Sequence, residues 1–344
     1  MKILAVIDSP GGADFLAPVW SRLASEHECR LITVGPTASA ALKEFAPTRC
    51  DTLAKAQKIY DEFGPDRLVT GVSSLIKGPY ALNELVKYAA ERGQTIIALQ
   101  DYWANHRAPH NRAMINYWTK VCLPDELAKN YLLADGYRGA AVVTGHPGWE
   151  KCLAAAPAAA DGEFVLLWAG SAAPGSEAAD EESFRFLLAA VKSLNPRPAL
   201  LVRAHPRDEA PARYERLAEE AGVTLRPPPT ADTDALLPRA DVVLATYSTS
   251  LIHAALGKIA AVSVMLPDAG LAKMKSIGLP DFPLNQLGAA IGVYENDPNI
   301  LTQILIKLRD DAAYRATLRA KQEQFAASLG RDAATRVAAA ITAA

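Results

Sequence analysis

The feature that most limits the fold is an alternation of short apolar runs with amphipathic stretches along almost the whole chain. Such runs are typical of parallel strands buried on both faces, and the stretches between them are typical of helices that cover those faces. The sequence therefore predicts an α/β protein with parallel sheets and helices on both faces. The expected strands are Lys2–Ile7, Arg30–Val34, Arg67–Thr70, Thr95–Leu99, Val121–Leu123, Ala141–Thr144, Phe164–Trp168, Ala199–Val202, Val223–Leu225, Val242–Ala245 and Ala260–Val264.

The chain length predicts two domains, because 344 residues exceed a typical single core. Residues 151–162 are Ala-rich, contain Pro157 and interrupt the alternation, so we expect a linker there. Residues 1–150 and 163–344 are then two Rossmann-like domains facing each other, and the last helices either complete the second domain or pack back on the first. The expected helices are Phe15–Ser25, Ala38–Phe45, Pro79–Arg92, Ser183–Leu194, Tyr214–Gly222, Thr233–Leu237, Leu251–Leu256 and stretches within 298–344.

Charge and cysteine content exclude some classes of protein. The 36 basic and 38 acidic residues give a net charge of −2, which argues against a nucleic-acid binder with a basic stripe. The four cysteines form no C-x-x-C pair and are expected to be reduced thiols in a cytoplasmic protein. The first apolar run stops at Asp8, and no run approaches the roughly 20 apolar residues of a membrane span. We expect a cytoplasmic protein, with peripheral contact at the inner face of a membrane left open.

Two motifs in the second half indicate an anion site. The strand Leu201–Val202 runs into Arg203, His205 and Pro206, and the strand Val242–Ala245 is followed by Ser248, Thr249 and Ser250 at the start of a helix. A hydroxyl-rich turn at a helix N-terminus favours a phosphate, because backbone N–H groups and the helix dipole point toward it. Arg203 and His205 then face the same anion, or else they make only local hydrogen bonds at the strand end.

A loop of small residues follows the first strand of the second half. Gly170 and Ser171 begin this Gly-, Ala- and Ser-rich segment, which lets a phosphate or sugar approach the backbone. A merely flexible loop is the alternative. We place both residues in the predicted nucleotide site.

The first strand of the chain leads into a second Gly-containing loop. Gly11 and Gly12 follow Asp8, and Asp14 comes next on the expected helix. The full G-x-G-x-x-G pattern is absent, so a dinucleotide-dependent dehydrogenase is disfavoured. We interpret the loop as an acceptor-binding segment, the alternative being a plain turn with Asp14 as the helix cap.

A dense polar and aromatic segment follows the strand Thr95–Leu99. Asp101 is a candidate general base, Trp103 a candidate flat surface for a sugar ring, and His106 and Arg107 candidate contacts for an anionic acceptor. Ligands of open α/β sheets bind at this edge of the strands. A solvated loop with one buried aromatic is the alternative.

At these residues the chain resembles the GT-B superfamily of nucleotide-sugar glycosyltransferases and their epimerase relatives. The resemblance rests on Val242–Ala245, the Ser248–Ser250 turn and Gly257-Lys258 in the second half. The His205-Pro206 pair is similar to that of bacterial transferases for CMP-activated sialic acid or Kdo, and to that of CDP-glycerol glycerophosphotransferases. His253 stands about where many UDP-sugar transferases carry a ribose-binding acid, which favours a cytidine donor.

The resemblance implies a metal-independent glycosyltransferase that moves a sugar from a nucleotide-sugar to a surface-glycan or glycoprotein acceptor. In this hypothesis Ser248–Ser250 bind the donor phosphate, and Arg203 and His205 neutralise the leaving group. Either Asp101 or Asp14 deprotonates the acceptor. No metal ion and no cofactor are expected. The alternatives are a nucleotide-sugar hydrolase or 2-epimerase of the same fold, and a non-catalytic subunit of a glycan-assembly complex.

Overall fold

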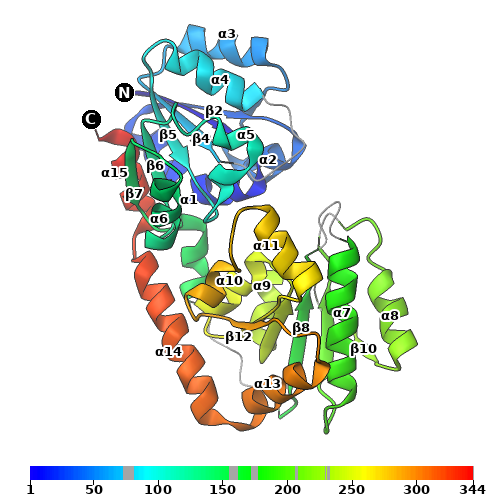
Figure 1. Ribbon diagram of the computed structural model, residues 1–344. Coiled ribbons are helices and arrows are strands. Elements are labelled where there is room, and N and C mark those ends of the chain that lie inside the picture. Colours follow the sequence, from blue (N-terminus) through cyan, green and yellow to red (C-terminus); the bar gives the residue numbers. More distant parts are fainter. Residues whose placement is uncertain are drawn as a thin grey trace. The chain divides into compact units, whose positions relative to one another are not determined.

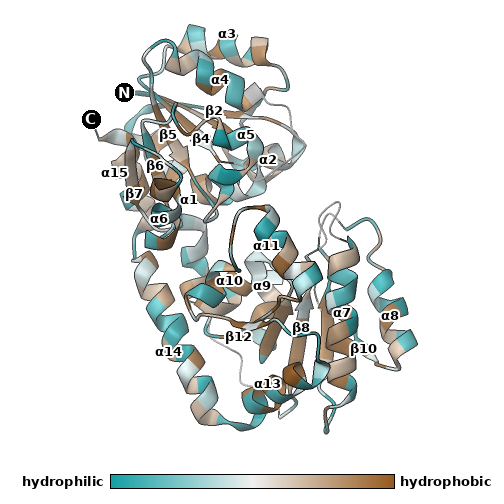
Figure 2. Ribbon diagram, viewed as in Figure 1, coloured by the Kyte–Doolittle hydropathy of each residue, from teal (hydrophilic) through white to brown (hydrophobic). Residues whose placement is uncertain are grey.

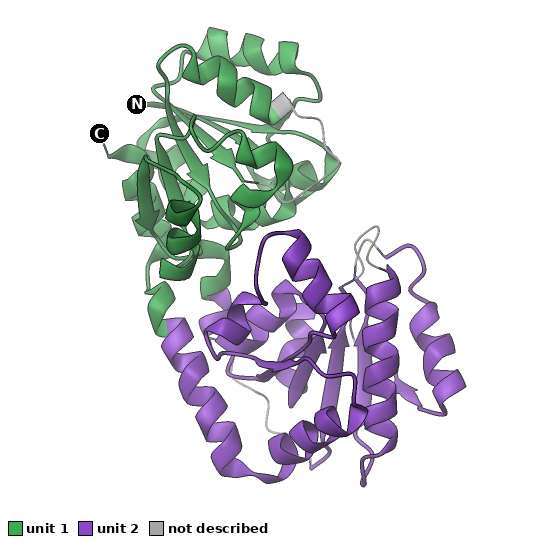
Figure 3. Cartoon of the chain, viewed as in Figure 1, with its two compact units in different colours: residues 1–150, 327–344 green, residues 151–326 purple. Residues whose placement is uncertain are grey.

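The chain folds into two compact units, seen in a computed structural model (Figures 1 and 3). Unit 1 comprises residues 1–150 and 327–344, and unit 2 comprises residues 151–326. The structure describes residues 1–72, 81–154, 162–171, 177–205, 208–228, 230 and 233–343.

Unit 1 is built on a seven-stranded, wholly parallel sheet with strand order β3-β2-β1-β4-β5-β6-β7. The apolar runs predicted to be strands form most of it, and the short edge strand β3 was not predicted. The strands are β1 (Lys2–Ile7), β2 (Glu28–Thr33), β3 (Thr48–Arg49), β4 (Arg67–Gly71), β5 (Thr95–Leu99), β6 (Lys120–Leu123) and β7 (Ala140–Val143).

The helices of unit 1 cover this sheet. Helices α1, α2 and α15 share a core with strands β1, β4 and β5, so the last helix of the chain packs on the first. Lys120 Nζ on β6 donates to the Ala340 carbonyl of α15 at 2.8 Å. The helices are α1 (Pro10–Glu26), α2 (Pro36–Ala41), α3 (Leu53–Phe63), α4 (Ala81–Ala90), α5 (Pro109–Arg112), α6 (Glu126–Ala134) and α15 (Ala333–Thr342).

Unit 2 is built on a second parallel sheet, with six strands in the order β10-β9-β8-β11-β12-β13. In Figure 2 its strands are predominantly hydrophobic in colour, as expected for strands covered on both faces. The strands are β8 (Val165–Ala169), β9 (Ala199–Arg203), β10 (Leu225–Arg226), β11 (Val242–Ala245), β12 (Ala260–Val264) and β13 (Ile291–Val293).

Helices α7, α8 and α13 share one core with the strands of unit 2, with Trp168, Phe184 and Tyr214 among its largest buried side chains. Helix α14 crosses from unit 2 into unit 1, whose second segment starts at Ala327. The helices are α7 (Glu177–Lys192), α8 (Arg213–Ala221), α9 (Thr233–Leu236), α10 (Thr249–Leu256), α11 (Ala272–Ser276), α12 (Pro283–Gln286), α13 (Pro298–Asp310) and α14 (Ala312–Leu329).

Each sheet has a topological switch point, at which successive strands are added on the opposite side of the first strand. In unit 1 this point lies between β1 and β4, and in unit 2 it lies between β8 and β11. Ligands of open parallel sheets bind outside the carboxyl ends of the strands at such a point. A ligand site is therefore expected at the loops that follow these four strands.

The predicted fold class, two α/β units with parallel sheets, is confirmed. Strands β3 and β13 were missed because they are only two and three residues long at the sheet edges. Helices α3 and α6 were also missed, although the buried residues Ala56, Tyr60 and Phe63 of α3 have helical spacing and α6 begins at the capping residue Asp125. The first two residues of the expected helix Pro79–Arg92 lie outside the described residues. Within the ranges that the structure describes, no helix is long and apolar enough to cross a membrane.

Candidate functional site

Unit 2 carries a candidate site at the carboxyl ends of the adjacent strands β8 and β11. Gly170 and Ser171 follow β8, and Tyr247 and Ser248 follow β11 shortly after its last residue. The Tyr247 backbone N–H donates to Ser171 Oγ at 3.3 Å, so a hydrogen bond joins the two loops. Both loops stand where the strand order changes direction, which is the expected ligand position in such a sheet.

Helix α10 starts at the β11 loop with a hydroxyl cap. Ser248 has extended backbone, and its Oγ accepts a hydrogen bond from the Ser250 N–H at 3.2 Å. Thr249 and Ser250 form the first turn of the helix. The first-turn N–H groups of a helix lack intrahelical partners and, together with the dipole, favour a bound anion. The structure thus places the three predicted phosphate residues at a helix N-terminus beside the β8 loop.

Strand β9 brings Arg203 and His205 to the other side of the β8 loop. The Gly170 N–H donates to the Arg203 carbonyl at 2.9 Å, and Arg203 Nη1 donates to the Ala204 carbonyl at 2.7 Å. A Cβ atom on Gly170 would lie 2.4 Å from the Tyr214 hydroxyl and 3.3 Å from the His205 backbone nitrogen. A larger residue at this position would therefore require the Tyr214 hydroxyl to move. The predicted Pro206 lies outside the described residues.

His253 belongs to a different polar cluster of unit 2. Its Nδ1 lies 2.8 Å from Asp234 Oδ1, and Lys151 Nζ lies 3.2 Å from the other oxygen of Asp234. Burial lowers the pKa of His253, but hydrogen bonds to Asp234 and Cys152 outweigh it and raise the pKa to about 9. The same ion pair lowers the pKa of Asp234 to about 2. The His253 ring is therefore cationic and already bound to the Asp234 carboxylate. Its contact with a nucleotide stays a prediction.

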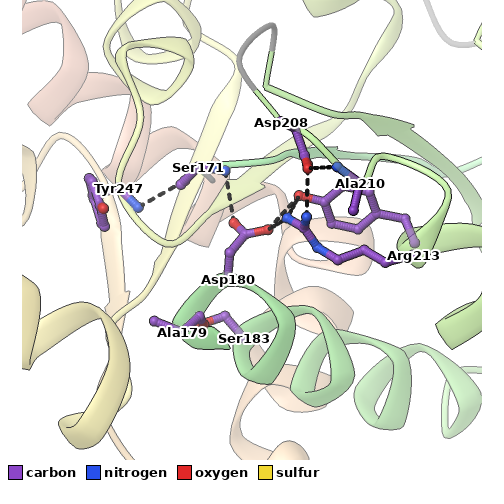
Figure 4. Close-up of polar contacts among 9 residues, drawn as sticks. Ser171, Ala179, Asp180, Ser183, Asp208, Ala210, Arg213 and Tyr247 are labelled. Carbon is purple, nitrogen blue, oxygen red and sulfur yellow. Dashed lines mark hydrogen bonds and ion pairs between the residues drawn. The ribbon is translucent and has the colours of Figure 1, made fainter. Parts of the chain in front are cut away.

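A buried polar network that no sequence motif indicates lies directly beneath the β8 loop (Figure 4). Asp180 on α7 accepts from the Ser171 N–H at 2.8 Å and from Arg213 Nη2 at 3.3 Å, and it also bonds the Tyr214 hydroxyl. Arg213 Nη1 donates to Asp208 Oδ1 at 2.6 Å. Burial raises the pKa of Asp180 and of Tyr214. The sequence did not indicate these residues, because three of them stand on the amphipathic helices α7 and α8 and none belongs to a recognisable motif.

Unit 1 carries a second candidate site around Asp101, which follows β5. Asn105 Nδ2 donates to Asp101 Oδ1 at 2.5 Å and to the Val72 carbonyl at 3.0 Å, which connects the loops after β5 and β4. Burial, with a smaller contribution from the carboxylates of Asp8 and Asp14, raises the pKa of Asp101 to about 7 against the opposing hydrogen bond from Asn105. A carboxyl group with this pKa can exchange a proton near neutral pH, as a general acid or base must.

The N-terminus of α1 forms the other side of this site. Ser9 caps the helix and accepts from the Gly12 N–H at 3.1 Å, so the cap is Ser9 and not Asp14. A Cβ atom on Gly11 would lie only 1.7 Å from Asp101 Oδ2. Asp14 lies one turn into the helix and acts electrostatically on Asp101. The structure thus brings Gly11, Asp14 and Asp101 together.

The other three acceptor candidates are built into the protein framework. Trp103 has no exposed surface, and its Nε1 donates to Asp125 Oδ2 at 2.6 Å, so its ring is a core element and is not open to a sugar. His106 is 1% exposed; its two ring nitrogens lie 2.9 Å from Gln100 Oε1 and 2.8 Å from Asp135 Oδ2. Arg107 Nε donates to the same Asp135 oxygen at 2.5 Å. The polar side chains of the segment that follows β5 thus form hydrogen bonds within the protein.

Replacement of Gly11 by alanine is expected to reduce turnover strongly while the protein stays folded. The new methyl group would overlap Asp101 Oδ2, so the carboxyl group must leave its present position. Helix propensity favours alanine by about 0.5–1 kcal/mol, which offsets part of the packing cost. The measurement is the turnover of the variant next to its circular dichroism spectrum.

Gly12→Ala is the matched control, because it makes the same change one residue later in the same helical turn. Its nearest neighbours are Ser9 Oγ at 3.2 Å and Ile7 Cγ2 at 3.3 Å, and Asp101 is not among them. We expect this variant to keep most of its turnover. Equal losses in the two variants would show that the helix start matters and the position of Asp101 does not.

No protein-family model and no curated protein matches the chain. Solved structures do match it. A Listeria monocytogenes chain described as a UDP-N-acetylglucosamine 2-epimerase has a TM-score of 0.71 at 14% identity, over 99% of this chain and 95% of its own. The Neisseria meningitidis UDP-GlcNAc 2-epimerase, solved with UDP-GlcNAc, has a TM-score of 0.69 at 13% identity over 99% of both chains.

A glycosyltransferase from Rickettsia africae also matches, with a TM-score of 0.63 at 13% identity over 99% of this chain and 98% of its own. These likenesses extend over both units and show the GT-B fold. At such identities they show the fold alone, because one fold hosts many activities.

Proposed function

We propose that the protein is an enzyme that acts on a nucleotide-sugar and transfers its sugar to a glycan or glycoprotein acceptor. The observation that carries the proposal is the arrangement in unit 2. A serine-capped helix N-terminus, a Gly-Ser loop and the Arg203–His205 strand end meet at the carboxyl edge of three adjacent strands. This set of groups fits a phosphate, and the solved structures of the same fold support a nucleotide-sugar, since one was solved with UDP-GlcNAc.

Each residue has a role that follows from its chemistry. The N–H groups at the start of α10, together with the hydroxyl groups of Ser248, Thr249 and Ser250, would hold the phosphate. Arg203 and His205 would stabilise the negative charge that grows on the leaving nucleotide as the bond to the sugar breaks. Asp101 in unit 1, with its pKa raised to about 7 by burial, would accept the proton of the acceptor hydroxyl.

A second candidate is a nucleotide-sugar 2-epimerase or hydrolase. The matches to the Listeria and Neisseria chains favour it, because both are described as 2-epimerases and both are covered almost completely. It needs the same phosphate site and the same proton acceptor. The two candidates differ in whether the donor turns over when no acceptor is present.

The direct test is incubation of the purified protein with UDP-GlcNAc, and separately with a CMP-activated sugar, followed by NMR of the products. Transfer predicts that nucleotide is released only when an acceptor glycan is added. Epimerisation predicts a changed configuration at C2 without acceptor, and hydrolysis predicts free sugar. Absence of all three products would favour the non-catalytic alternative.

Free nucleotides are expected to raise the unfolding temperature, because a ligand that binds only the folded state stabilises it. At 100 times its Kd, a nucleotide adds about 2.7 kcal/mol, which corresponds to roughly 5–10 °C for a unit of this size. The measurement is a thermal-shift panel of CMP, CDP, UMP, UDP, GDP and ADP. A shift with CMP alone favours a CMP-sugar donor, one with CDP a glycerophosphotransferase, and one with UDP a UDP-sugar donor.

The matched control for this panel is the nucleoside without phosphate. Uridine and cytidine carry the same bases but cannot occupy a phosphate site, so they are expected to give little or no shift. A nucleoside that shifts the transition as far as its nucleotide would contradict the assignment of the α10 N-terminus to phosphate.

A further inference from the structure

The buried network beneath the β8 loop is centred on Asp180. Its side chain is 1% exposed, and one of its oxygens accepts from the Ser171 N–H at 2.8 Å (Figure 4). The other oxygen accepts from Arg213 Nη2 at 3.3 Å and from the Tyr214 hydroxyl. Asp180 therefore connects the backbone of the β8 loop to the start of helix α8.

The network continues from Arg213 to the loop after β9. Arg213 Nη1 donates to Asp208 Oδ1 at 2.6 Å, and the same oxygen accepts from the Ala210 N–H at 3.0 Å. The Asp208 N–H in turn donates to the His205 carbonyl at 2.9 Å. One end of the network therefore holds the backbone carbonyl of His205.

The third connection leads to the loop after β11. Ser171, whose N–H is held by Asp180, accepts the Tyr247 N–H on its Oγ at 3.3 Å. Tyr247 directly precedes Ser248, the cap of α10. One buried carboxylate thus lies at the centre of contacts that fix all three loops of the candidate phosphate site.

A network of this kind is poorly explained by stability alone. Removing charges from water is costly, and a well-packed hydrophobic set of similar volume often stabilises a protein as much or more. Hydrogen bonds between buried charged groups do, however, fix loop geometry, and a binding site needs groups held to within about 0.5 Å. The position of the network under three site loops is what such a role requires.

We propose that Asp180 is a positioning residue for phosphate recognition, which it serves by holding Ser171 and, through Arg213 and Asp208, the backbone of His205. This inference rests on the proposed function, since it assumes that the three loops bind a nucleotide. Loss of the Asp180 carboxylate leaves Ser171, Arg213 and Tyr214 without a shared partner. The loops then sample more conformations, and nucleotide affinity falls because binding must restore their order.

The experiment is titration calorimetry of UDP and CMP with the wild type and with Asp180→Asn. We expect the nucleotide that binds the wild type to bind the variant at least 10-fold more weakly. In turnover assays, KM for the donor should rise more than kcat falls. Tyr214→Phe removes one hydroxyl from the network and keeps its charges, so it should show a smaller effect in the same direction even if Asp180→Asn folds poorly.

Asp241→Asn is the matched control. Asp241 also has a carboxylate that accepts a backbone N–H, from Val165 at 2.7 Å, but it does so at the amino end of the same strand β8. This variant should lose stability and keep its nucleotide affinity. Equal loss of affinity in the Asp180 and Asp241 variants would overturn the positioning role, as would unchanged affinity in Asp180→Asn. A wild type that binds neither nucleotide would instead contradict the proposed function.

Discussion

Asp101→Asn is expected to lower turnover by about 10²–10⁴-fold, the usual contribution of a positioned general base. Asparagine has nearly the same shape as aspartate. Its side-chain oxygen can still accept the hydrogen bond that Asn105 Nδ2 donates to Asp101 Oδ1 at 2.5 Å. It cannot accept a proton. The measurement is kcat and KM for the donor at saturating acceptor, where kcat should fall and KM should change little.

The pH dependence of turnover by the wild type should show the titration of Asp101. Burial raises the pKa of Asp101 to about 7, so a base at this position becomes active as pH rises through about 7. In the unfolded chain the group ionises near its ordinary value of 3.8. Asp101 is therefore protonated in the folded but not in the unfolded protein between pH 4 and 7, and its contribution to the stability of the wild type falls as pH rises through this window.

Asp101→Asn should consequently gain thermal stability over the wild type, with a difference that grows from pH 4 to pH 7 and then stays constant. Asp125→Asn is the control, because Asp125 is also a buried carboxylate of unit 1 but caps α6 and holds Trp103 Nε1. It should retain turnover. If Asp101→Asn is as active as the wild type, the proton acceptor lies elsewhere, and Asp14 is the next candidate.

The fold could be predicted because its signals are local and repeated. Each central strand is an apolar run that is buried on both faces, and β1, β5, β11 and β12 have the predicted bounds. The ends of the sheets could not be predicted in the same way. β3 and β13 are held by their neighbours and carry little hydrophobic pattern of their own.

The candidate sites were only partly predictable, because a motif gives the position of a residue along the chain and not what its side chain contacts. Ser248 was predictable, since its role as a cap depends on the next few residues. Trp103 and His106 were expected to meet an acceptor, yet their partners Asp125 and Asp135 lie more than 20 residues away along the chain. Asp180 had no motif, because its importance comes from partners in the β8 loop and on α8, which in turn contact the loops after β9 and β11.

The double variant Arg203→Ala with His205→Ala is expected to reduce turnover by about 10³-fold or more. Each removed group that stabilises developing charge typically costs about 10²–10³-fold in kcat. Affinity for the intact nucleotide-sugar should fall less than turnover, because the oxygen that joins the phosphate to the sugar gains negative charge only as that bond breaks. The measurement combines kcat with the Kd of the intact nucleotide-sugar in the absence of acceptor, and the two single variants test whether the residues act as a unit.

Arg226→Ala is the control for the loss of a cation from the same sheet. Arg226 lies on β10, next to β9, and forms an exposed ion pair with Glu163 at 2.5 Å, so its removal should change stability and turnover little. Full activity in the double variant would show that Arg203 and His205 do not stabilise the leaving nucleotide. Loss of nucleotide affinity without a change in kcat would keep Arg203 and His205 in the binding site but take them out of the chemical step. A loss concentrated in kcat is the result that a transition-state role requires.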